Sequence, residues 1–336
     1  MSPGSPRAPR LPRVVVVGPT ATGKSALALD LAERMHSDEP ATRAEIINAD
    51  ASLLYRGMDI GTAKPSPAER ARVPHHQIDV LTVRDRASVA AFQRSARGDI
   101  DAVESRGHLP IIAGGSGLYV RALTDDLDFP GTDPAVRAGL EERARAEGTR
   151  ALWEEMAAVD PLSAQRIGES DTRRIVRALE VLAVTGRPFS ATLPRYEDLA
   201  PTIHLALRPP REALNARINA RAAAMFRPAS GPGLIEETQG LIGAGLREGP
   251  TASRAIGYAQ ALAVIDGAMA IDEAIDATAA ATRQLASRQL KWFRRDPRIH
   301  WIDMRLAPDG TPPDGERQRV LDIALSLLPG ATGARG

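Results

Sequence analysis

The 336-residue sequence contains no cysteine. That absence excludes disulfide bridges, thiolate zinc sites and a cysteine nucleophile, and it fits a protein of a reducing compartment. No apolar run approaches the ~20 residues that a membrane-spanning helix needs. The Pro- and Arg-rich residues 1–12 lack the apolar stretch of a signal peptide, so we expect a disordered lead-in there. We therefore predict a cytoplasmic protein, monomeric and without membrane association.

Net charge and lysine are scarce as well. The formal charge is only +1, so a surface for a polyanion must be a local patch. Only three of the 43 basic residues are lysine, namely Lys24, Lys64 and Lys291. Unless codon composition alone explains this bias, each lysine is expected to have a specific use. The hydrophobic content of 43% and charged content of 25% are ordinary for a globular protein.

Strand-like and helical segments alternate through the first part of the chain. A helical pattern at 24–35 follows the first β-branched run. Such alternation predicts an α/β fold whose parallel sheet is built from βαβ units. The predicted strands are residues 14–17, 45–50, 77–81, 109–113 and, later in the chain, 203–207.

The second half is dominated by helical patterns, which predicts a divided core. Helices are expected at 211–226, 233–247, 256–270 and 272–295, with one short helix near 315–328. We predict a discontinuous α/β core at 13–128 and 201–305, a helical insertion at 129–200, and a loosely held tail at 306–336.

Residues 18–25 (GPTATGKS) match the pattern Gly-x-x-x-x-Gly-Lys-Ser/Thr completely, and they lie between a predicted strand and helix. Glycines let several backbone N–H groups face one concavity, where the helix N-terminus adds its positive end. Lys24 is expected to reach the outer phosphate, and the Ser25 hydroxyl to bind Mg²⁺. The predicted phosphate cradle consists of Gly18, Pro19, Thr20, Ala21, Thr22, Gly23, Lys24 and Ser25.

This P-loop does not by itself name a reaction. No Asn-Lys-x-Asp guanine-binding motif accompanies it, which argues against a GTPase of the Ras type. Asp50 follows the second predicted strand, where a parallel sheet presents catalytic groups. From the residues alone, a general base and a magnesium-site or helix-capping aspartate are equally compatible with that position.

Several segments together resemble the tRNA dimethylallyltransferase (isopentenyltransferase) family over about residues 13–302. The most specific is the block 55–65 (YRGMDIGTAKP). The other matching blocks, in the order of the family, are GPTATGKS at 18–25, NAD at 48–50, PHHQID at 74–79, GGSGLY at 114–119, RRIVRALE at 173–180, AIGY at 255–258 and RQLASRQ at 283–289.

The resemblance implies a P-loop NTPase-like core and a defined reaction. The exocyclic N6 amine of the adenosine 3′-adjacent to the anticodon would displace diphosphate from dimethylallyl diphosphate, with Mg²⁺ as cofactor and no use of ATP. It implies that Asp50 is the base that accepts the amine proton. It also implies that Thr20 lies beside the reacting atoms and that Lys24 and Arg221 contact the diphosphate, with Arg217 as the competing arginine.

A basic stretch near residue 290 is the candidate RNA surface. Between Arg283 and Arg298 six basic residues stand against one acid, and Arg288, Lys291 and Arg295 share a predicted helical face. A solvated helix face is the competing interpretation. The resemblance implies that the anticodon loop is held by Asp50, Ala51, Ser52, Leu53, Ser116, Arg137, Arg173, Arg174, Arg177, Arg254, Arg283, Arg288 and Lys291.

Several further residues have simpler interpretations. Many family members have Ser-Met-Gln where this chain has Ala-Ser-Leu at 51–53, which weakens the case for polar substrate contacts there. The histidines at 75 and 76 are predicted to be structural, and Trp292 and Phe293 to be core residues. The tyrosines at 55, 119 and 258 could stack on a base. Two rival functions remain, a small-metabolite kinase and a non-catalytic RNA-binding module with a vestigial P-loop.

Overall fold

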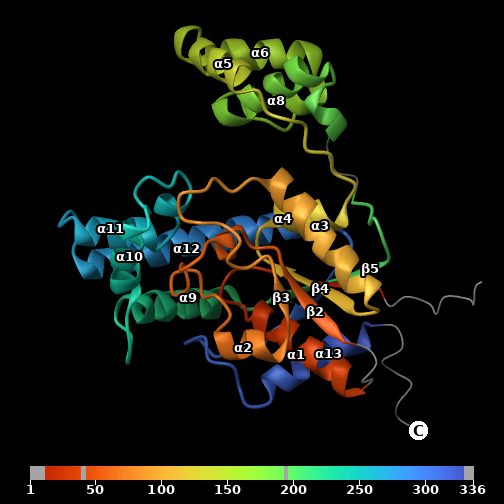
Figure 1. The fold of residues 1–336 in the computed structure, drawn as a ribbon, viewed down its shortest axis with the longest axis vertical. Helices are drawn as coiled ribbons and strands as arrows, with labels where there is room; N and C mark the ends of the chain where they lie inside the picture. Colours follow the sequence, from red (N-terminus) through yellow and green to blue (C-terminus); the bar gives the residue numbers. More distant parts are fainter. Residues whose placement is uncertain (1–11, 39–42, 193–195, 329–336) are drawn as a thin grey trace, which may run out of the picture. The chain divides into compact units, whose positions relative to one another are not determined.

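The computed structural model describes residues 12–38, 43–192 and 196–328 (Figure 1). In this part of the chain six strands form one parallel sheet, in the order β3-β2-β4-β1-β5-β6. The predicted α/β fold is therefore confirmed. The strands are β1 (Arg13–Val17), β2 (Ala44–Asn48), β3 (His75–His76), β4 (Leu109–Gly114), β5 (Thr202–Arg208) and β6 (Ile299–Asp303).

Helices cover both faces of the sheet, which is why its central strands are continuously apolar. On one face Val14 and Val16 of β1 belong to a core that includes residues of α1 (Lys24–Asp38) and α13 (Glu316–Ser326). Helices α3 (Val89–Ser105) and α4 (Gly117–Thr124) pack on β4 from the other face (Figure 1). The carboxyl ends of the strands are left to loops.

One strand prediction was wrong. The sequence suggested a strand at 77–81, but β3 ends at His76. Gln77 and Asp79 have φ angles of 58° and 59°, a left-handed backbone that cannot continue an extended strand. Leu81 forms only an isolated parallel bridge with Tyr55.

The C-terminal part of the chain is more ordered than predicted. Strand β6 was missed, although it pairs with β5 along the edge of the sheet. The short helix predicted near 315–328 is confirmed as α13. It is not loosely held as expected, because Val320, Leu321 and Ala324 are buried in the same core as α1. Residues 1–11 of the predicted lead-in at 1–12 lie outside the described residues, as do the last residues, 329–336.

Four helices form a second group beside the sheet. The helix predicted at 211–226 is confirmed at its full length, and the other three are shorter than predicted. Helices α9 and α12 pack against each other, as do α10 and α11. The four are α9 (Arg211–Phe226), α10 (Leu234–Gly243), α11 (Tyr258–Ile265) and α12 (Ile271–Phe293).

The chain divides into two compact units, one of them the segment Asp125–Glu197. Its bounds lie a few residues before those of the insertion that the sequence suggested, 129–200. This unit has its own apolar core, which includes Leu152, Met156 and Ile175. Its helices are α5 (Pro134–Ala146), α6 (Thr149–Val159), α7 (Pro161–Ala164) and α8 (Thr172–Thr185). Among the described residues of the whole chain, no helix is long and apolar enough to cross a membrane.

Candidate active site

The P-loop turns sharply between β1 and α1. Gly18, Ala21 and Gly23 have φ angles of 141°, 64° and 89°, and the Thr22 hydroxyl donates to the Pro19 carbonyl at 2.9 Å. Because α1 begins directly after this turn, its first backbone N–H groups and its positive dipole end are available to an anion. The local structure is therefore that of a phosphate cradle.

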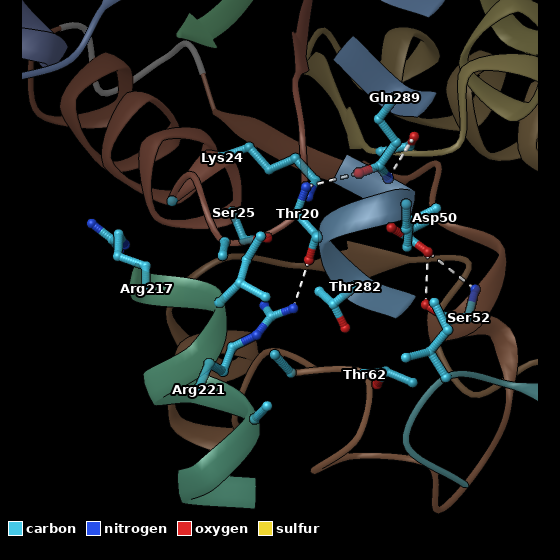
Figure 2. A pocket seen from close by; sticks show the side chains of 18 of the residues that line it. Thr20, Lys24, Ser25, Asp50, Ser52, Thr62, Arg217, Arg221, Thr282 and Gln289 are labelled. Atoms are coloured by element: carbon cyan, nitrogen blue, oxygen red, sulfur yellow. Dashed lines mark hydrogen bonds between the residues drawn. The ribbon is translucent and has the colours of Figure 1, made fainter. Parts of the chain in front are cut away.

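A cavity of about 840 Å³ lies at this turn. Thr20, Lys24 and Ser25 line it from the P-loop side, Asp50 lines it from the end of β2, and Arg221 from α9 (Figure 2). Residues far apart in the sequence thus meet at the carboxyl edge of the sheet, as expected for an open parallel sheet. The wall is completed by α12 and by the loop at 61–63.

The cavity concentrates positive charge. Burial lowers the pKa of Lys24; Asp50 opposes that shift and Arg221 adds to it. The pKa of Arg221 is likewise lowered by burial, against the attraction of Asp50, and lowered further by Arg217. Cations forced together in a partly desolvated site are stabilised when a polyanion binds among them. The electrostatics therefore favour a ligand such as a diphosphate.

Arg221 and Arg217, the two competing arginines, both line the cavity but have different partners. Arg221 donates from Nη2 to the Thr20 hydroxyl at 2.6 Å, which holds its guanidinium against the P-loop. Arg217 makes a longer contact, 3.5 Å from Nη1 to the Gly310 carbonyl. The arrangement therefore favours Arg221 as the arginine that acts together with the P-loop.

The backbone at Asp50 is fixed by a side chain. The Asn48 amide accepts from the Asp50 N–H at 2.9 Å and donates to the carbonyl groups of Asp50 and Gln77. Oδ1 of Asp50 accepts from the Ser52 N–H and hydroxyl, at 3.1 and 2.7 Å, and so caps the short helix Ala51–Leu54. Within the described residues, Oδ2 has no hydrogen-bond partner. The capping role is therefore real, and it leaves one carboxylate oxygen for the cavity.

Magnesium binding at Ser25 stays a prediction. The Ser25 side chain is exposed and lines the cavity. No group of three or more His, Cys, Asp or Glu side chains suited to a metal occurs in the described parts of the chain. Mg²⁺ commonly takes only one or two protein ligands and fills its shell with water and substrate phosphate oxygens. One serine hydroxyl beside a phosphate cradle is consistent with that coordination preference.

Several cavity residues were missed in the sequence, among them Gln289, Thr62 and Thr282. Gln289 of α12 contacts the P-loop backbone, and Thr62 and Thr282 line the wall shown between Arg221 and Ser52 in Figure 2. Gln289 ends the block 283–289 that carries the family resemblance, and its place in that block was the available signal. Thr62 lies in the block 55–65 and carried the same kind of signal, whereas Thr282 directly precedes the block 283–289 and carried none.

The predicted basic face of α12 is smaller than expected. Arg288 and Lys291 are exposed, and Arg288 also lines the cavity. Arg295 lies beyond the end of the helix. Arg298 is turned away, with ion pairs of 2.6 Å to Asp296 and 2.9 Å to Asp198.

Of the other predicted RNA contacts in this unit, Ser116 and residues 51–53 line the cavity, and Arg254 and Arg283 do not. Arg283 donates to the Asn219 side chain, and Arg254 is exposed. Ser116 lines the cavity together with Ala51–Leu53, and its hydroxyl accepts from the Ala51 N–H at 3.2 Å.

The arginines of the unit Asp125–Glu197 differ in their ion-pair partners and in their exposure. Arg137 and Arg177 both pair with Glu180, whose side chain is fully buried, at 2.5 and 2.8 Å. Arg174 pairs with Asp171 at 3.4 Å, and Arg173 is exposed. Arg137 and Arg177 therefore help to stabilise their own unit, since a buried carboxylate needs charged partners.

The aromatic side chains also separate into buried and accessible groups. Tyr55 and Tyr258 are buried, so the suggestion that they stack on a base was wrong for the structure as it stands. Tyr119 packs against Phe92 with ring centroids 4.7 Å apart. Phe293 is a core residue as predicted, whereas its neighbour Trp292 is 39% exposed and lines the cavity.

The specific block 55–65 forms a braced loop. Lys64, 1% exposed, donates to the Tyr55 carbonyl at 2.7 Å and pairs with Asp59 and Asp79 at 2.6 Å each. The Glu237 carboxylate accepts from the backbone of the same loop, at 2.8 Å from the Ile60 N–H. Lys64 thus has a structural use, and it holds a loop that forms part of the cavity wall.

The parallel sheet, the strand-to-helix glycine loop and the cationic cavity at its mouth together define an α/β P-loop protein. The family model described as "IPP transferase" matches residues 53–296, which is more than half of the chain. The chain therefore belongs to the IPP transferase family, and the resemblance found in the sequence is confirmed.

Relatives of known name agree. The tRNA dimethylallyltransferase of Kineococcus radiotolerans is 51% identical over 326 residues, covering 97% of this chain and 99% of the relative. That of Streptomyces coelicolor is 48% identical over 322 residues, covering 96% and 97%. Each is a protein to which this chain is similar over nearly its full length.

Solved structures agree as well. The tRNA isopentenylpyrophosphate transferase of Bacillus halodurans is 33% identical with a TM-score of 0.63, covering 94% of this chain and 96% of the other. A eukaryotic dimethylallyltransferase acting on tRNA is 23% identical with a TM-score of 0.75, covering 94% and 78%. At that identity the second likeness speaks for the fold alone, and the P-loop NTPase-like core is confirmed.

Proposed function

We propose that the protein transfers the dimethylallyl group of dimethylallyl diphosphate to the N6 amine of the adenosine 3′-adjacent to the anticodon of a tRNA, and releases diphosphate. Family membership supports the reaction class. The observation that carries the proposal is one cavity lined by a phosphate cradle, a second cation at Arg221 and a carboxylate at Asp50. We propose that it acts as a monomer.

The cationic wall suits the leaving group. As the bond between the prenyl C1 and the diphosphate oxygen breaks, negative charge grows on that oxygen. Fixed donors that wait for developing charge are usually the largest single contribution to catalysis. Lys24, Arg221, the Thr20 hydroxyl and the P-loop amides are such donors. When bound at Ser25, Mg²⁺ would neutralise part of the same charge.

Asp50 suits the nucleophile. The exocyclic amine of adenine is a poor nucleophile because its lone pair is delocalised into the ring. As the new bond forms between N6 and the prenyl C1, a proton must leave N6, and Oδ2 of Asp50 is available to accept it. A positioned base is worth ~10²–10⁴-fold in rate. Oδ1 stays with Ser52, which keeps the carboxylate oriented.

The exposed cations suit an RNA loop. Arg254, Arg288 and Lys291 are exposed, and Arg288 reaches the cavity mouth. Side chains of this kind bind phosphates with little regard to sequence. Extruding a base costs a few kcal/mol and least from a single strand, so a loop adenine is the natural substrate of an enclosed cavity. The predicted partner is therefore the anticodon loop.

Nucleoside mass spectrometry tests this proposal. Unmodified tRNA is incubated with the protein and dimethylallyl diphosphate, and its nucleosides are analysed; the wild type should yield N6-dimethylallyladenosine. Lys24→Ala should lower the yield at least ~10²-fold, the usual cost of one charge-stabilising donor. Parallel reactions with ATP measure nucleotide turnover. ATP consumption without tRNA modification would point to a small-metabolite kinase, and tRNA binding without any transfer to a non-catalytic RNA-binding module.

A further inference from the structure

Gln289 joins two walls of the cavity. Its Oε1 accepts from the Thr20 N–H at 2.8 Å, and its Nε2 donates to the Gly115 carbonyl at 2.9 Å. The side chain is 7% exposed, so both hydrogen bonds are shielded from water. Thr20 belongs to the P-loop, and Gly115 follows β4. Figure 2 shows Thr20 between Gln289 and Arg221, which contacts its hydroxyl.

The Gly115 end of this bridge lies beside the proposed base. A Cβ added to Gly115 would lie 2.4 Å from Nε2 of Gln289 and 3.4 Å from Oδ2 of Asp50. No side chain larger than hydrogen fits there without movement, so glycine allows the amide and the carboxylate to approach the same backbone. A short chain of contacts therefore runs from Thr20 through Gln289 and Gly115 to Asp50.

We infer that Gln289 is a positioning residue that sets the distance between the diphosphate cradle and Asp50. The inference rests on the proposed function. Because Gln289 occupies the Thr20 N–H, that amide is not offered to the substrate, and Thr20 is held from both sides by Gln289 and Arg221. A displacement of 1 Å between reacting groups can cost ~10²-fold in rate even when both substrates still bind.

The same residue connects the cradle to the helix that carries Arg288 and Lys291. Arg288 is its immediate neighbour in α12, and both residues line the cavity. RNA held by the exposed side of α12 is thereby tied, through one buried amide, to the loop that holds the leaving group. The two hydrogen bonds of Gln289 thus fix three parts of the site relative to one another: helix α12, the P-loop and the proposed general base Asp50.

Two substitutions test the inference. Gln289→Met keeps the length and bulk of the side chain but removes both hydrogen bonds. Gln289→Glu keeps an acceptor for Thr20 and loses the donor to Gly115. Gln239→Met is the matched control, because Gln239 is exposed on α10 and does not line the cavity. For each variant we would measure the single-turnover rate with both substrates saturating, the Kd of each substrate separately, and the Tm.

Gln289→Met should slow the chemical step by ~10²-fold, while the Kd for dimethylallyl diphosphate and for tRNA changes by less than about 3-fold. Gln289→Glu should be less impaired. Its rate relative to wild type should rise as the pH falls, because a protonated glutamic acid regains a donor for Gly115. Gln239→Met should match wild type in all measurements. If Gln289 merely filled space, the rate of Gln289→Glu would not recover at low pH, because the hydrogen bond to the Gly115 carbonyl would not matter.

Three results would overturn the inference. A wild-type rate in Gln289→Met means that the bridge sets no distance. A fall in affinity for dimethylallyl diphosphate that accounts for the whole loss makes Gln289 a binding residue. If Gln289→Met does not fold, Gln289→Glu decides, and a deficit without pH dependence then assigns a packing role. A wild type that transfers no prenyl group instead defeats the proposed function, so the two failures are distinguishable.

Discussion

Asp50 uses its two carboxylate oxygens differently. Oδ1 caps a short helix through Ser52, and Oδ2 faces the cavity near Gly115. The capping and general-base interpretations, which compete when only the sequence is considered, therefore concern different atoms. A general base and a magnesium-site residue can still be distinguished by whether added Mg²⁺ restores the rate of the chemical step when Asp50 is replaced.

Asp50→Asn tests that assignment. The amide is nearly isosteric and retains an oxygen that can cap the helix, so folding and the affinity for both substrates should survive. Loss of the proton acceptor should lower the chemical step by ~10²–10⁴-fold. Single-turnover kinetics across a magnesium titration, with both substrates saturating, measures it.

The control for this variant is Ser52→Ala, which removes one hydrogen bond to Oδ1 and spares Oδ2. It should cost much less than Asp50→Asn. Recovery of the Asp50→Asn rate by added Mg²⁺, together with weakened affinity for the prenyl diphosphate, would make Asp50 a magnesium-site residue instead of a base.

At the residue scale, local motifs could be predicted and remote partners could not. The P-loop residues and Asp50 stand out because each sits in a short pattern with a known geometric meaning. The role of Gln289 depends on Thr20 and Gly115, which lie 269 and 174 positions away in the chain. Nothing local in the sequence marks such contacts. Arg137 and Arg177 show the same limit, since their charge is visible in the sequence but their partner Glu180 is visible only in the fold.

At the scale of elements, helices were easier to predict than edge strands. Helix α9 shows a long apolar period and was located in full, and α12 ended two residues earlier than expected. Short strands carry less information: β3 has two residues, and β6 follows a basic stretch that masked it. The end of α12 explains why Arg295 leaves the predicted face. Trp292 and Phe293 have different environments because successive residues of a helix point about 100° apart.

Helix α12 makes a testable contact with RNA phosphates. Arg288→Ala combined with Lys291→Ala should reduce the slope of log affinity against log salt by about 1 to 2, with little change in base preference, because cations that neutralise phosphates release counterions. Filter binding of tRNA across a salt series measures the slope.

A charge-matched control uses Arg208→Ala with Arg317→Ala. Both arginines are held in ion pairs, with Asp303 and Asp30 respectively, and removing them changes the net charge by the same amount. An unchanged slope in the α12 variant, or an equal change in the control, would return α12 to a merely solvated face.

At the scale of the whole molecule, one buried carboxylate ties together the edge of the sheet. Glu45 of β2 accepts from His76 of β3 and from His108, each at 2.6 Å, and from Arg106 at 2.8 Å. Burial by itself raises the pKa of Glu45, but these hydrogen bonds outweigh it and lower the pKa from 4.5 to about 2. The histidine at 76 is thus structural, as its position before an apolar run suggested.

This carboxylate should make the fold sensitive to acid. A folded-state pKa below the unfolded one stabilises the native state above about pH 4.5, and the contribution is lost as the pH falls towards about 2. Its upper limit is on the order of 3 kcal/mol. Glu45→Gln should therefore unfold more easily at pH 7 and lose less of its stability between pH 5 and 3, as measured by urea titration.

Glu248→Gln is the control, because Glu248 is exposed. It should follow the wild-type pH profile throughout. If Glu45→Gln also followed that profile, the ionised Glu45 cluster would not contribute to the stability of the sheet.

The division into two units could be anticipated from the change in sequence pattern, and its bounds only to within a few residues. Strand-like runs stop near the first bound and resume with β5, but the exact bounds depend on which residues pack in each core. The packing of the C-terminal helix α13 could likewise not be predicted, because its apolar side is buried against α1, which is remote in the sequence.

Because the protein has only three lysines, acylation of each amine can report whether the surface around it is occupied. Lys64 is enclosed by its ion pairs, Lys24 faces the cavity, and Lys291 is exposed on α12. A brief treatment with an amine-reactive ester, read by peptide mass spectrometry, should thus modify Lys291 readily and Lys64 hardly at all. Diphosphate should shield Lys24, and tRNA should shield Lys291, so each substrate leaves a separate footprint on a single chain. Protection of Lys24 by diphosphate that left Lys291 fully reactive would show the cradle filled while the RNA surface stayed open.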